Sequence, residues 1–166
     1  MAVGEMGLPD FGRVEGLRLG VAEAGIKTPG RKDVVVIEIA EGSQVAAVFT
    51  QNKFCAAPVH VAKKHLKGGV PRYMVINTGN ANAGTGKSGM RAAHQTCDLV
   101  ASAAGCDVTA VLPFSTGVIG EDLVVSPFAN SMPTLLESLG ENGWEGASQA
   151  IMTTDTVAKL SSRRVS

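Results

Sequence analysis

The chain of 166 residues is long enough to bury a sizeable core, and 45% of its residues are apolar against 18% charged, which excludes a disordered chain. Lys and Arg together number 15, as do Asp and Glu, and this balance disfavours nucleic acid or an acidic membrane surface as a partner. Aromatic residues make up only 4% and glycines number 20, so we expect a core of Val, Ile, Leu and Ala joined by tight turns.

Several features of the sequence bear on location and organisation. Residues 1–16 show no apolar run and no Arg-rich amphipathic pattern, so we expect no signal or transit peptide. No apolar run reaches the length of a membrane span. The three cysteines, Cys55, Cys97 and Cys106, lack the spacing of a metal site, which favours reduced, buried thiols. The sequence therefore predicts a cytoplasmic protein, and without repeats or linkers it predicts one domain over residues 1–166.

The first half of the chain contains clear strand and helix patterns. The β-branched run Asp33–Ala40 predicts a strand, and after a Gly-Ser turn Val45–Thr50 is expected to be its hairpin partner. A helix is expected from Pro58 to about Leu66, because Pro suits a first turn and two glycines follow. Tyr73–Asn77 predicts a second buried strand.

The next predicted helix follows a glycine-rich loop. Ser88 is expected to cap this helix, which runs to about Ala104 and stops at Gly105. Apolar residues three and four apart predict its buried face. They are Met90, Ala93, Cys97, Val100, Ala101 and Ala104.

The second half predicts a strand over Val108–Phe114 that runs into Ser115-Thr116-Gly117. A helical region is expected from Ser126 to Gly140, with a break at Pro133, and a short helix over Trp144–Met152. A final strand is expected after Thr156. Because strands and helices mix without a regular alternation, the pattern predicts a layered α/β or α+β fold.

The segment from Ala81 to Ser88 approximates a phosphate-binding loop, since Gly86-Lys87-Ser88 stands between a predicted strand and a predicted helix. Ala81, however, occupies the place of the first glycine, which lets the backbone fold around phosphate. No apolar strand ends in an Asp suited to hold magnesium. A glycine-rich turn before a helix is therefore favoured over nucleotide binding.

Two other segments can carry chemistry. The loop Asn77–Ala83 holds three asparagines, which supply hydrogen-bond donors and acceptors and tolerate the left-handed conformation of tight loops. Ser115-Thr116-Gly117 stands where a predicted strand ends in small residues, and there a hydroxyl and a backbone N–H can face one point, as stabilisation of an oxyanion requires. Taken singly, each pattern is also compatible with an ordinary turn.

Together with four further segments, these residues resemble the ornithine acetyltransferase (glutamate N-acetyltransferase) family of arginine biosynthesis. The similar segments occur in the family's order and span nearly the whole chain from about Gly20. They are Gly30–Asp33, Val48–Thr50 with Asn52, Ala56–Pro58, Val75–Ala83 with Thr85-Gly86, Ser115–Gly120 and Ala150–Thr156.

The resemblance implies an α/β (α+β) layered sheet-and-helix sandwich of the DmpA/ornithine-acetyltransferase-like, N-terminal-nucleophile type. It also implies a precursor that cleaves itself before a threonine, which then becomes the nucleophile of a second, β, chain. The acetyl group would pass from N-acetylornithine to that threonine and onward to glutamate. No cofactor or metal is expected, although some family members also accept acetyl-CoA as a donor.

By the same resemblance, Thr116 and Gly117 form the oxyanion hole and Thr153 binds substrate, although a polar turn that ends a helix would equally explain Thr153. The family's Lys-Gly-[Ser/Ala]-Gly-Met segment and Met-Ala-Thr cleavage site do not occur in this sequence. We therefore expect a companion β-chain and a heterotetramer of two α and two β chains. Three alternatives stay open: a related self-processing amidase or aminopeptidase, a nucleotide-binding module using residues 84–88, and an inactive fragment.

Overall fold

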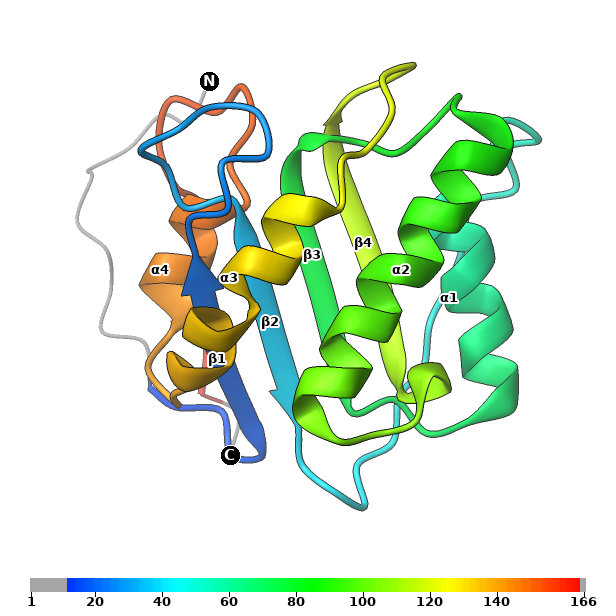
Figure 1. Ribbon diagram of the computed structural model, residues 1–166. Helices are drawn as coiled ribbons and strands as arrows, with labels where there is room; N and C mark the ends of the chain where they lie inside the picture. Colours follow the sequence, from blue (N-terminus) through cyan, green and yellow to red (C-terminus); the bar gives the residue numbers. More distant parts are fainter. Residues whose placement is uncertain (1–11, 165–166) are drawn as a thin grey trace.

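The computed structural model describes residues 12–164, so the expectations for a targeting peptide within residues 1–11 lie outside it. The fold is mixed α/β, as predicted, and is built on one four-stranded sheet in the order β1-β2-β3-β4 (Figure 1). Its strands are β1 (Leu17–Ala22), β2 (Val34–Ile39), β3 (Tyr73–Asn80) and β4 (Val111–Val118). The pairs β1–β2 and β2–β3 are antiparallel, whereas β3 and β4 run parallel, so their carboxyl ends meet at one edge of the sheet.

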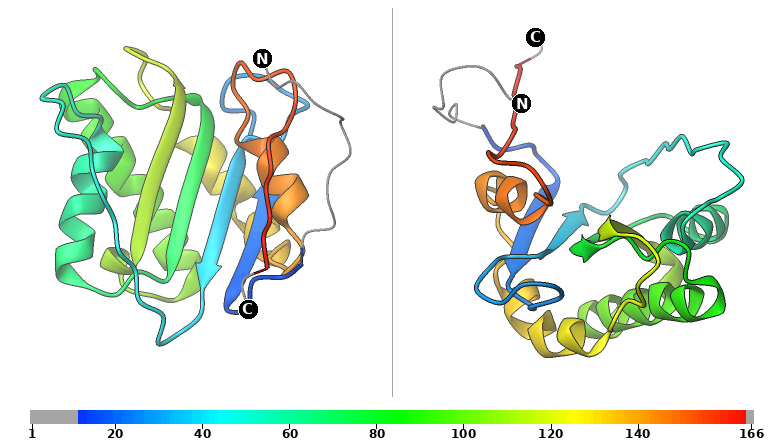
Figure 2. Two further views of the ribbon diagram at one scale, coloured as in Figure 1. Left: turned by 180° about the vertical axis from the view of Figure 1, so that it is seen from behind. Right: turned by 90° about the horizontal axis from the view of Figure 1, so that it is seen from above.

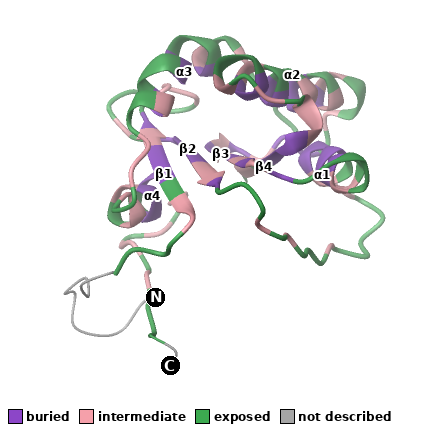
Figure 3. Cartoon of the chain, turned by 90° about the horizontal axis from the view of Figure 1, so that it is seen from below, coloured by how far each residue is buried: buried purple, intermediate pink, exposed green. Residues whose placement is uncertain are grey.

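Within the described residues, four α-helices surround this sheet, namely α1 (Ala57–Gly68), α2 (Gly86–Ala104), α3 (Ser126–Glu137) and α4 (Trp144–Ala150). Helices α2 and α3 cover one face, while α4 packs on the other face against β1 and β2, and α1 lies beside β4 (Figures 1 and 3). The segment between β2 and α1 extends away from the sheet on the side opposite α2 and α3 (Figure 2). None of the helices within residues 12–164 is long and apolar enough to cross a membrane.

The core lies on both faces of the sheet. Val34 and Val36 face α2 and α3, where Phe128 and Leu135 are fully buried, whereas Val35 points to the opposite face and packs with the residues of α4. Alternate side chains of a strand point to opposite faces, so a continuous valine run suits a strand covered on both sides. Burying each such side chain contributes about 1.5–3 kcal/mol.

The prediction of a strand over Val45–Thr50 is wrong. These residues have no regular structure, and the Val48 side chain is 99% exposed. Strand β2 instead pairs with β1 on one edge and with β3 on the other, which leaves no edge for a further partner. The strand expected after Thr156 is also wrong, because no strand forms over residues 153–164.

The predicted helices are confirmed, but some of their boundaries shift. Helix α2 begins before Ser88, whose hydroxyl lies 2.6 Å from the Asp122 carboxylate instead of capping the helix. Gly105 ends this helix with φ of 68°, as predicted. The break expected at Pro133 is wrong: α3 continues through Pro133, which lies on its exposed side, where water can satisfy the free carbonyl.

Strand β4 differs from the prediction in a way that matters for the site. A short 3₁₀ helix occupies Val108–Ala110, and the strand then runs from Val111 to Val118. Ser115, Thr116 and Gly117 therefore lie within the strand and pair with β3. Cys55, Cys97 and Cys106 are free thiols, of which only Cys97 is fully buried.

Candidate active site

A cavity of about 480 Å³ lies at the carboxyl ends of β3 and β4. The strand ends form one side of its lining, and the loop between β1 and β2 together with the segment after α4 forms the rest. Thr116, Gly117 and Thr153 all line this cavity, so the fold brings together the three residues selected from the sequence. Its lining also includes Lys27, Arg31, Asp33, Thr78 and Gly79.

The direction of Thr116 follows from its place in the strand. The Ser115 side chain points to the same face of the sheet as that of its β3 partner Asn77, and its hydroxyl donates to Asn77 Oδ1 at 2.6 Å. Since neighbouring strand residues point to opposite faces, Thr116 points to the other face of the sheet. Thr78, its partner on β3, donates a hydrogen bond to the Ala150 carbonyl at the end of α4, at 2.8 Å. The Thr116 hydroxyl is thus on the face that carries α4 and the following Thr153.

Gly117 allows the strand ends and the loop to stack closely. It pairs with Gly79 on β3, and both residues have positive φ, 135° and 97°. A Cβ on Gly79 would stand 2.6 Å from Lys27 Cβ, so the loop between β1 and β2 lies directly on β3. Glycine is required at both positions because any side chain would push these layers apart.

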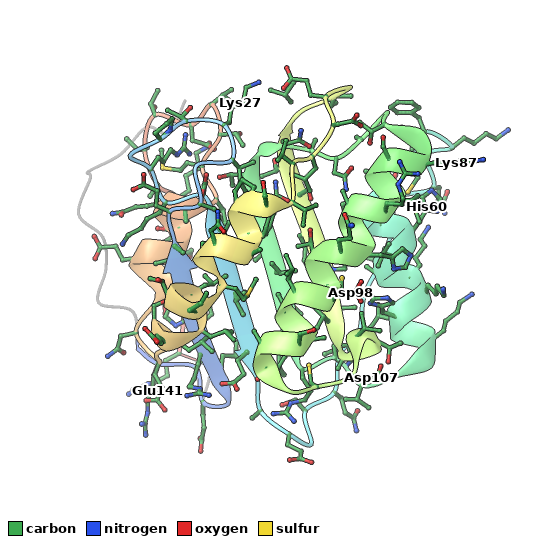
Figure 4. The ribbon with its side chains drawn as sticks, in the orientation of Figure 1. Lys27, His60, Lys87, Asp98, Asp107 and Glu141 are labelled. Atoms are coloured by element: carbon green, nitrogen blue, oxygen red, sulfur yellow. The ribbon has the colours of Figure 1, made fainter. Side chains whose placement is uncertain are left out.

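Two cations give the cavity its charge. Lys27 Nζ lies 2.6 Å from Glu121 Oε2, and Figure 4 shows Lys27 at the same end of the molecule as the carboxyl ends of β3 and β4. The Arg31 guanidinium donates to the Met152 carbonyl, which joins the loop to the segment that carries Thr153. Arg and Lys side chains recognise carboxylates, so the cavity suits a ligand that bears one.

Asp33 lines the cavity and also supports the loop between β1 and β2. The carboxylate is buried and accepts hydrogen bonds from the backbone N–H groups of Ala24, at 2.7 Å, and Ile26, at 2.6 Å. Within residues 12–164, no three His, Cys, Asp or Glu side chains gather into a group that could hold a metal ion.

The three asparagines of residues 77–83 point into the protein. Asn77, Asn80 and Asn82 are 1%, 5% and 0% exposed, and none of them lines the cavity. Asn82 Nδ2 donates to the Gly89 carbonyl at 2.9 Å, and its Oδ1 accepts from the Thr85 hydroxyl at 3.2 Å. These two bonds tie the Asn82 amide to the turn and to α2. Residues 82 and 84–87 of the turn line a second cavity, of about 560 Å³, together with His60, and Figure 4 labels His60 and Lys87.

Comparison with known proteins identifies the family, since the ArgJ family matches residues 18–166. The chain belongs to the ArgJ family. It is 54% identical over 164 residues to the arginine biosynthesis bifunctional protein ArgJ of Pseudomonas fluorescens (strain Pf0-1), a match that covers 99% of this chain and 40% of the relative. The ArgJ protein of Methylococcus capsulatus (strain Bath) is 53% identical over 152 residues, covering 92% of this chain and 37% of the relative. The chain therefore spans about two fifths of these ArgJ proteins.

Solved structures of ArgJ proteins share the fold. Ornithine acetyltransferase from Mycobacterium tuberculosis, solved in complex with ornithine, matches with a TM-score of 0.80 and 33% identity, covering 86% of this chain and 78% of that one. The arginine biosynthesis bifunctional protein from Bacillus halodurans also matches with a TM-score of 0.80, at 34% identity, covering 88% of this chain and 78% of that one. The predicted fold class is therefore confirmed.

The sequence left some lining residues of this ArgJ chain without a role. Arg31 and Asp33 occur in a segment that resembles the family, but only the fold shows Arg31 reaching Met152 and Asp33 closing the loop. Lys27 carries no local signal, since an isolated lysine in a polar loop is usually a solvated side chain.

Proposed function

We propose that this chain is the α-chain of an ornithine acetyltransferase, which transfers the acetyl group of N-acetylornithine to glutamate in arginine biosynthesis. The observation that carries the proposal is the convergence of Thr116, Gly117 and Thr153 on one cavity in a chain of the ArgJ family. The chain acts only with a companion β-chain, in a cytoplasmic heterotetramer of two α and two β chains.

In the proposed reaction, the hydroxyl of the β-chain's N-terminal threonine attacks the acetyl carbonyl carbon, and its own α-amino group takes the proton. The negative charge that develops on the carbonyl oxygen is stabilised by the Thr116 hydroxyl and the Gly117 backbone N–H. Breakage of the C–N bond releases ornithine, whose leaving amine takes the proton and leaves an acetyl ester on threonine. The amine of glutamate then attacks this ester through a second oxyanion, and the ester C–O bond breaks. The proton of the attacking amine passes through the α-amino group to the threonine oxygen, which restores the hydroxyl and releases N-acetylglutamate.

Exposed apolar residues beside Thr116 support the proposal that a companion chain covers this face of the sheet. Phe114 and Val118 alternate with Thr116 along β4 and so point to the same face of the sheet. They remain 41% and 37% exposed in this chain. A second chain that covers this face would exclude water from the oxyanion and strengthen its hydrogen bonds.

The direct test is acetyl transfer from N-acetylornithine to glutamate by this chain expressed with its β-chain. We expect activity without added metal or cofactor, and acetyl-CoA is tested as a second donor in the same assay. Thr116→Ala is expected to lower kcat about a hundredfold or more with assembly intact, because a donor to the transition state is lost. Thr116→Ser, which keeps the hydroxyl, should restore most of the rate. An assembled wild type that transfers no acetyl group would overturn the proposal.

The acetyl-transfer assay and thermal unfolding together separate the alternatives. An amidase or aminopeptidase would release the acyl group to water and show no dependence on glutamate. A nucleotide-binding module would be stabilised against heat by ATP or GTP with Mg²⁺, because any ligand of the native state raises its stability. We expect no such stabilisation, because Ala81 occupies the place of the first glycine of a phosphate-binding loop and the Asn82 amide is hydrogen-bonded within the turn and to α2.

A further inference from the structure

Two buried asparagines of β3, Asn77 and Asn80, hydrogen-bond to the chain before and after the strand segment that contains Thr116 and Gly117. Before this segment, the Ser115 hydroxyl donates to Asn77 Oδ1 at 2.6 Å. Beyond it, Asn80 Nδ2 lies 3.0 Å from the Glu121 carbonyl and 3.4 Å from the Asp122 carbonyl. The proposed oxyanion donors therefore lie between two side-chain anchors that both come from β3.

The two anchors are also joined to each other. Asn77 Nδ2 donates to the backbone carbonyl of Asn80 at 2.8 Å, so one amide connects Ser115 to the residue that holds the far end. Asn80 Oδ1 accepts from the Asn82 backbone N–H at 2.7 Å, which fixes the orientation of the Asn80 amide. Two backbone bonds add to this connection, from Ala81 to the Val118 carbonyl at 2.9 Å and from Gly120 to the Ala83 carbonyl at 2.8 Å.

Gly117 needs such anchoring because it has no side chain that could pack and set its orientation. Glycine has the freest backbone of all residues, and a donor placed about 1 Å away from its required position loses on the order of a hundredfold in rate. A backbone N–H that acts in an oxyanion hole is therefore only as well placed as the neighbours that hold it.

We propose that Asn77 and Asn80 are positioning residues that fix the Thr116–Gly117 segment for stabilisation of the oxyanion. This proposal rests on the proposed acetyl transfer and adds a second group of residues behind the donors. Neither asparagine lines the cavity, and both are at least nine-tenths buried. They act on the rate through Thr116 and Gly117 and make no contact with substrate.

Asparagine suits both positions because each side chain donates and accepts at once. An aspartate at position 80 would keep the acceptor for Asn82 but would direct an oxygen at the carbonyls of Glu121 and Asp122. Asn80→Asp therefore changes no side-chain volume and removes one anchor. Asn82→Asp is a matched control: it is equally isosteric and buried, and it breaks the bond to the Gly89 carbonyl in α2, away from Thr116.

The experiment measures kcat and KM for acetyl transfer with the α-chain variants assembled with the β-chain, together with thermal unfolding. We expect Asn80→Asp to lower kcat about ten- to a hundredfold with KM within about twofold of wild type, because ground-state binding is untouched. Asn82→Asp should lower thermal stability to a similar degree and keep kcat within about threefold. Unchanged kcat in folded Asn80→Asp, a rise in KM alone, or an equal loss of kcat in Asn82→Asp would each overturn the positioning role.

A second variant serves if Asn80→Asp does not assemble. Ser115→Ala removes the 2.6 Å bond to Asn77 without burying a charge, and we expect kcat to fall roughly tenfold with KM unchanged. A wild-type kcat in Ser115→Ala would count against the proposal. If wild type assembles but transfers no acetyl group, the proposed function itself fails, and the positioning role fails with it.

Discussion

Gly117 lies against the backbone of Gly79 so closely that a Cβ on Gly117 would stand 2.3 Å from the Gly79 carbonyl carbon and 2.6 Å from the backbone nitrogen of Asn80. Both atoms belong to rigid backbone, and neither can move without opening the pairing of β3 and β4. The end of β4 that carries the proposed oxyanion donors therefore accepts only glycine at this position.

Gly117→Ala is expected to abolish acetyl transfer and to lower the free energy of unfolding by about 3 kcal/mol or more, since the clash adds to the strain of a positive φ. Activity assays and chemical unfolding of the variant check this. Gly120→Ala is the matched control: Gly120 has φ of 83°, but nothing lies within 4 Å of its added Cβ. This variant should lose only about 1–2 kcal/mol for the left-handed backbone and remain active. Equal losses of activity and of unfolding free energy in the two variants would show that the positive φ, and not the contact with Gly79, makes glycine necessary at position 117.

Thr153 is predicted to act on substrate affinity. Thr153→Ala should raise KM for N-acetylornithine roughly five- to tenfold at nearly constant kcat, because one hydrogen bond common to ground and transition states is lost. Thr156 is exposed and does not line the cavity, so Thr156→Ala serves as the control and should leave both constants unchanged. A fall in kcat with constant KM in Thr153→Ala would assign Thr153 to the transition state instead.

Local sequence signals predicted most of the elements but missed β1. The Val34–Ile39 run, the apolar stripe of α2 and the glycine after it all depend on residues close in sequence. Strand β1 contains Gly20, a weak strand residue, and is a strand because β2 pairs with it. A Cβ on Gly20 would stand 2.3 Å from the Leu135 carbonyl, so this glycine makes room for α3, which no local pattern reveals.

The candidate site was predictable only in part, because the sequence identified its residues but not their distant partners. Resemblance to the ArgJ family selected Thr116, Gly117 and Thr153, and the fold places them around one cavity. The partners of the asparagines could not be read from the sequence, because Asn80 meets a carbonyl 41 residues away. An asparagine-rich loop predicts a structured turn, but only the tertiary fold decides which groups it holds.

Asp33 is predicted to stabilise the loop that covers Gly79. Its two carboxylate oxygens each accept a backbone N–H, so Asp33→Asn would place an amide N–H₂ against one of these donors. We expect a loss of about 2–3 kcal/mol in the free energy of unfolding, the cost of leaving a buried group unpaired. Asp98 is exposed on α2, and Asp98→Asn should change stability by less than about 0.5 kcal/mol. Denaturant unfolding of both variants makes the comparison, and equal stabilities would contradict the supporting role of Asp33.

Stability is also predicted to depend on pH through His94. The His94 ring on α2 lies 5.9 Å, between centroids, from the ring of His65, which is buried and donates through Nδ1 to the Val111 carbonyl at 2.7 Å. Burial, followed by the charges of His65 and Lys64, lowers the pKa of His94 below its usual 6.5, and Asp98 opposes this only in part. The unfolded chain therefore binds a proton at a higher pH than the folded chain does.

Because the unfolded state binds more protons in this range, the free energy of unfolding should decrease as pH falls through about 6.5 and lower. His94→Gln removes the titrating group and should flatten this decrease, whereas His60→Gln, on the exposed side of α1, should leave it as in wild type. Urea unfolding at several pH values from 8 to about 5 measures the slope. A wild-type slope in His94→Gln would show that groups other than His94 carry the acid sensitivity in this pH range. Glu38 is not one of them, because its hydrogen bond with Arg18 lowers its pKa below the usual carboxyl value, so its contribution changes only at lower pH. A flattened slope would instead assign the acid sensitivity of stability to His94, at the contact between α1 and α2. This contact lies on the opposite side of β4 from the Thr116 face, so the proposed oxyanion site would have no direct part in the pH response.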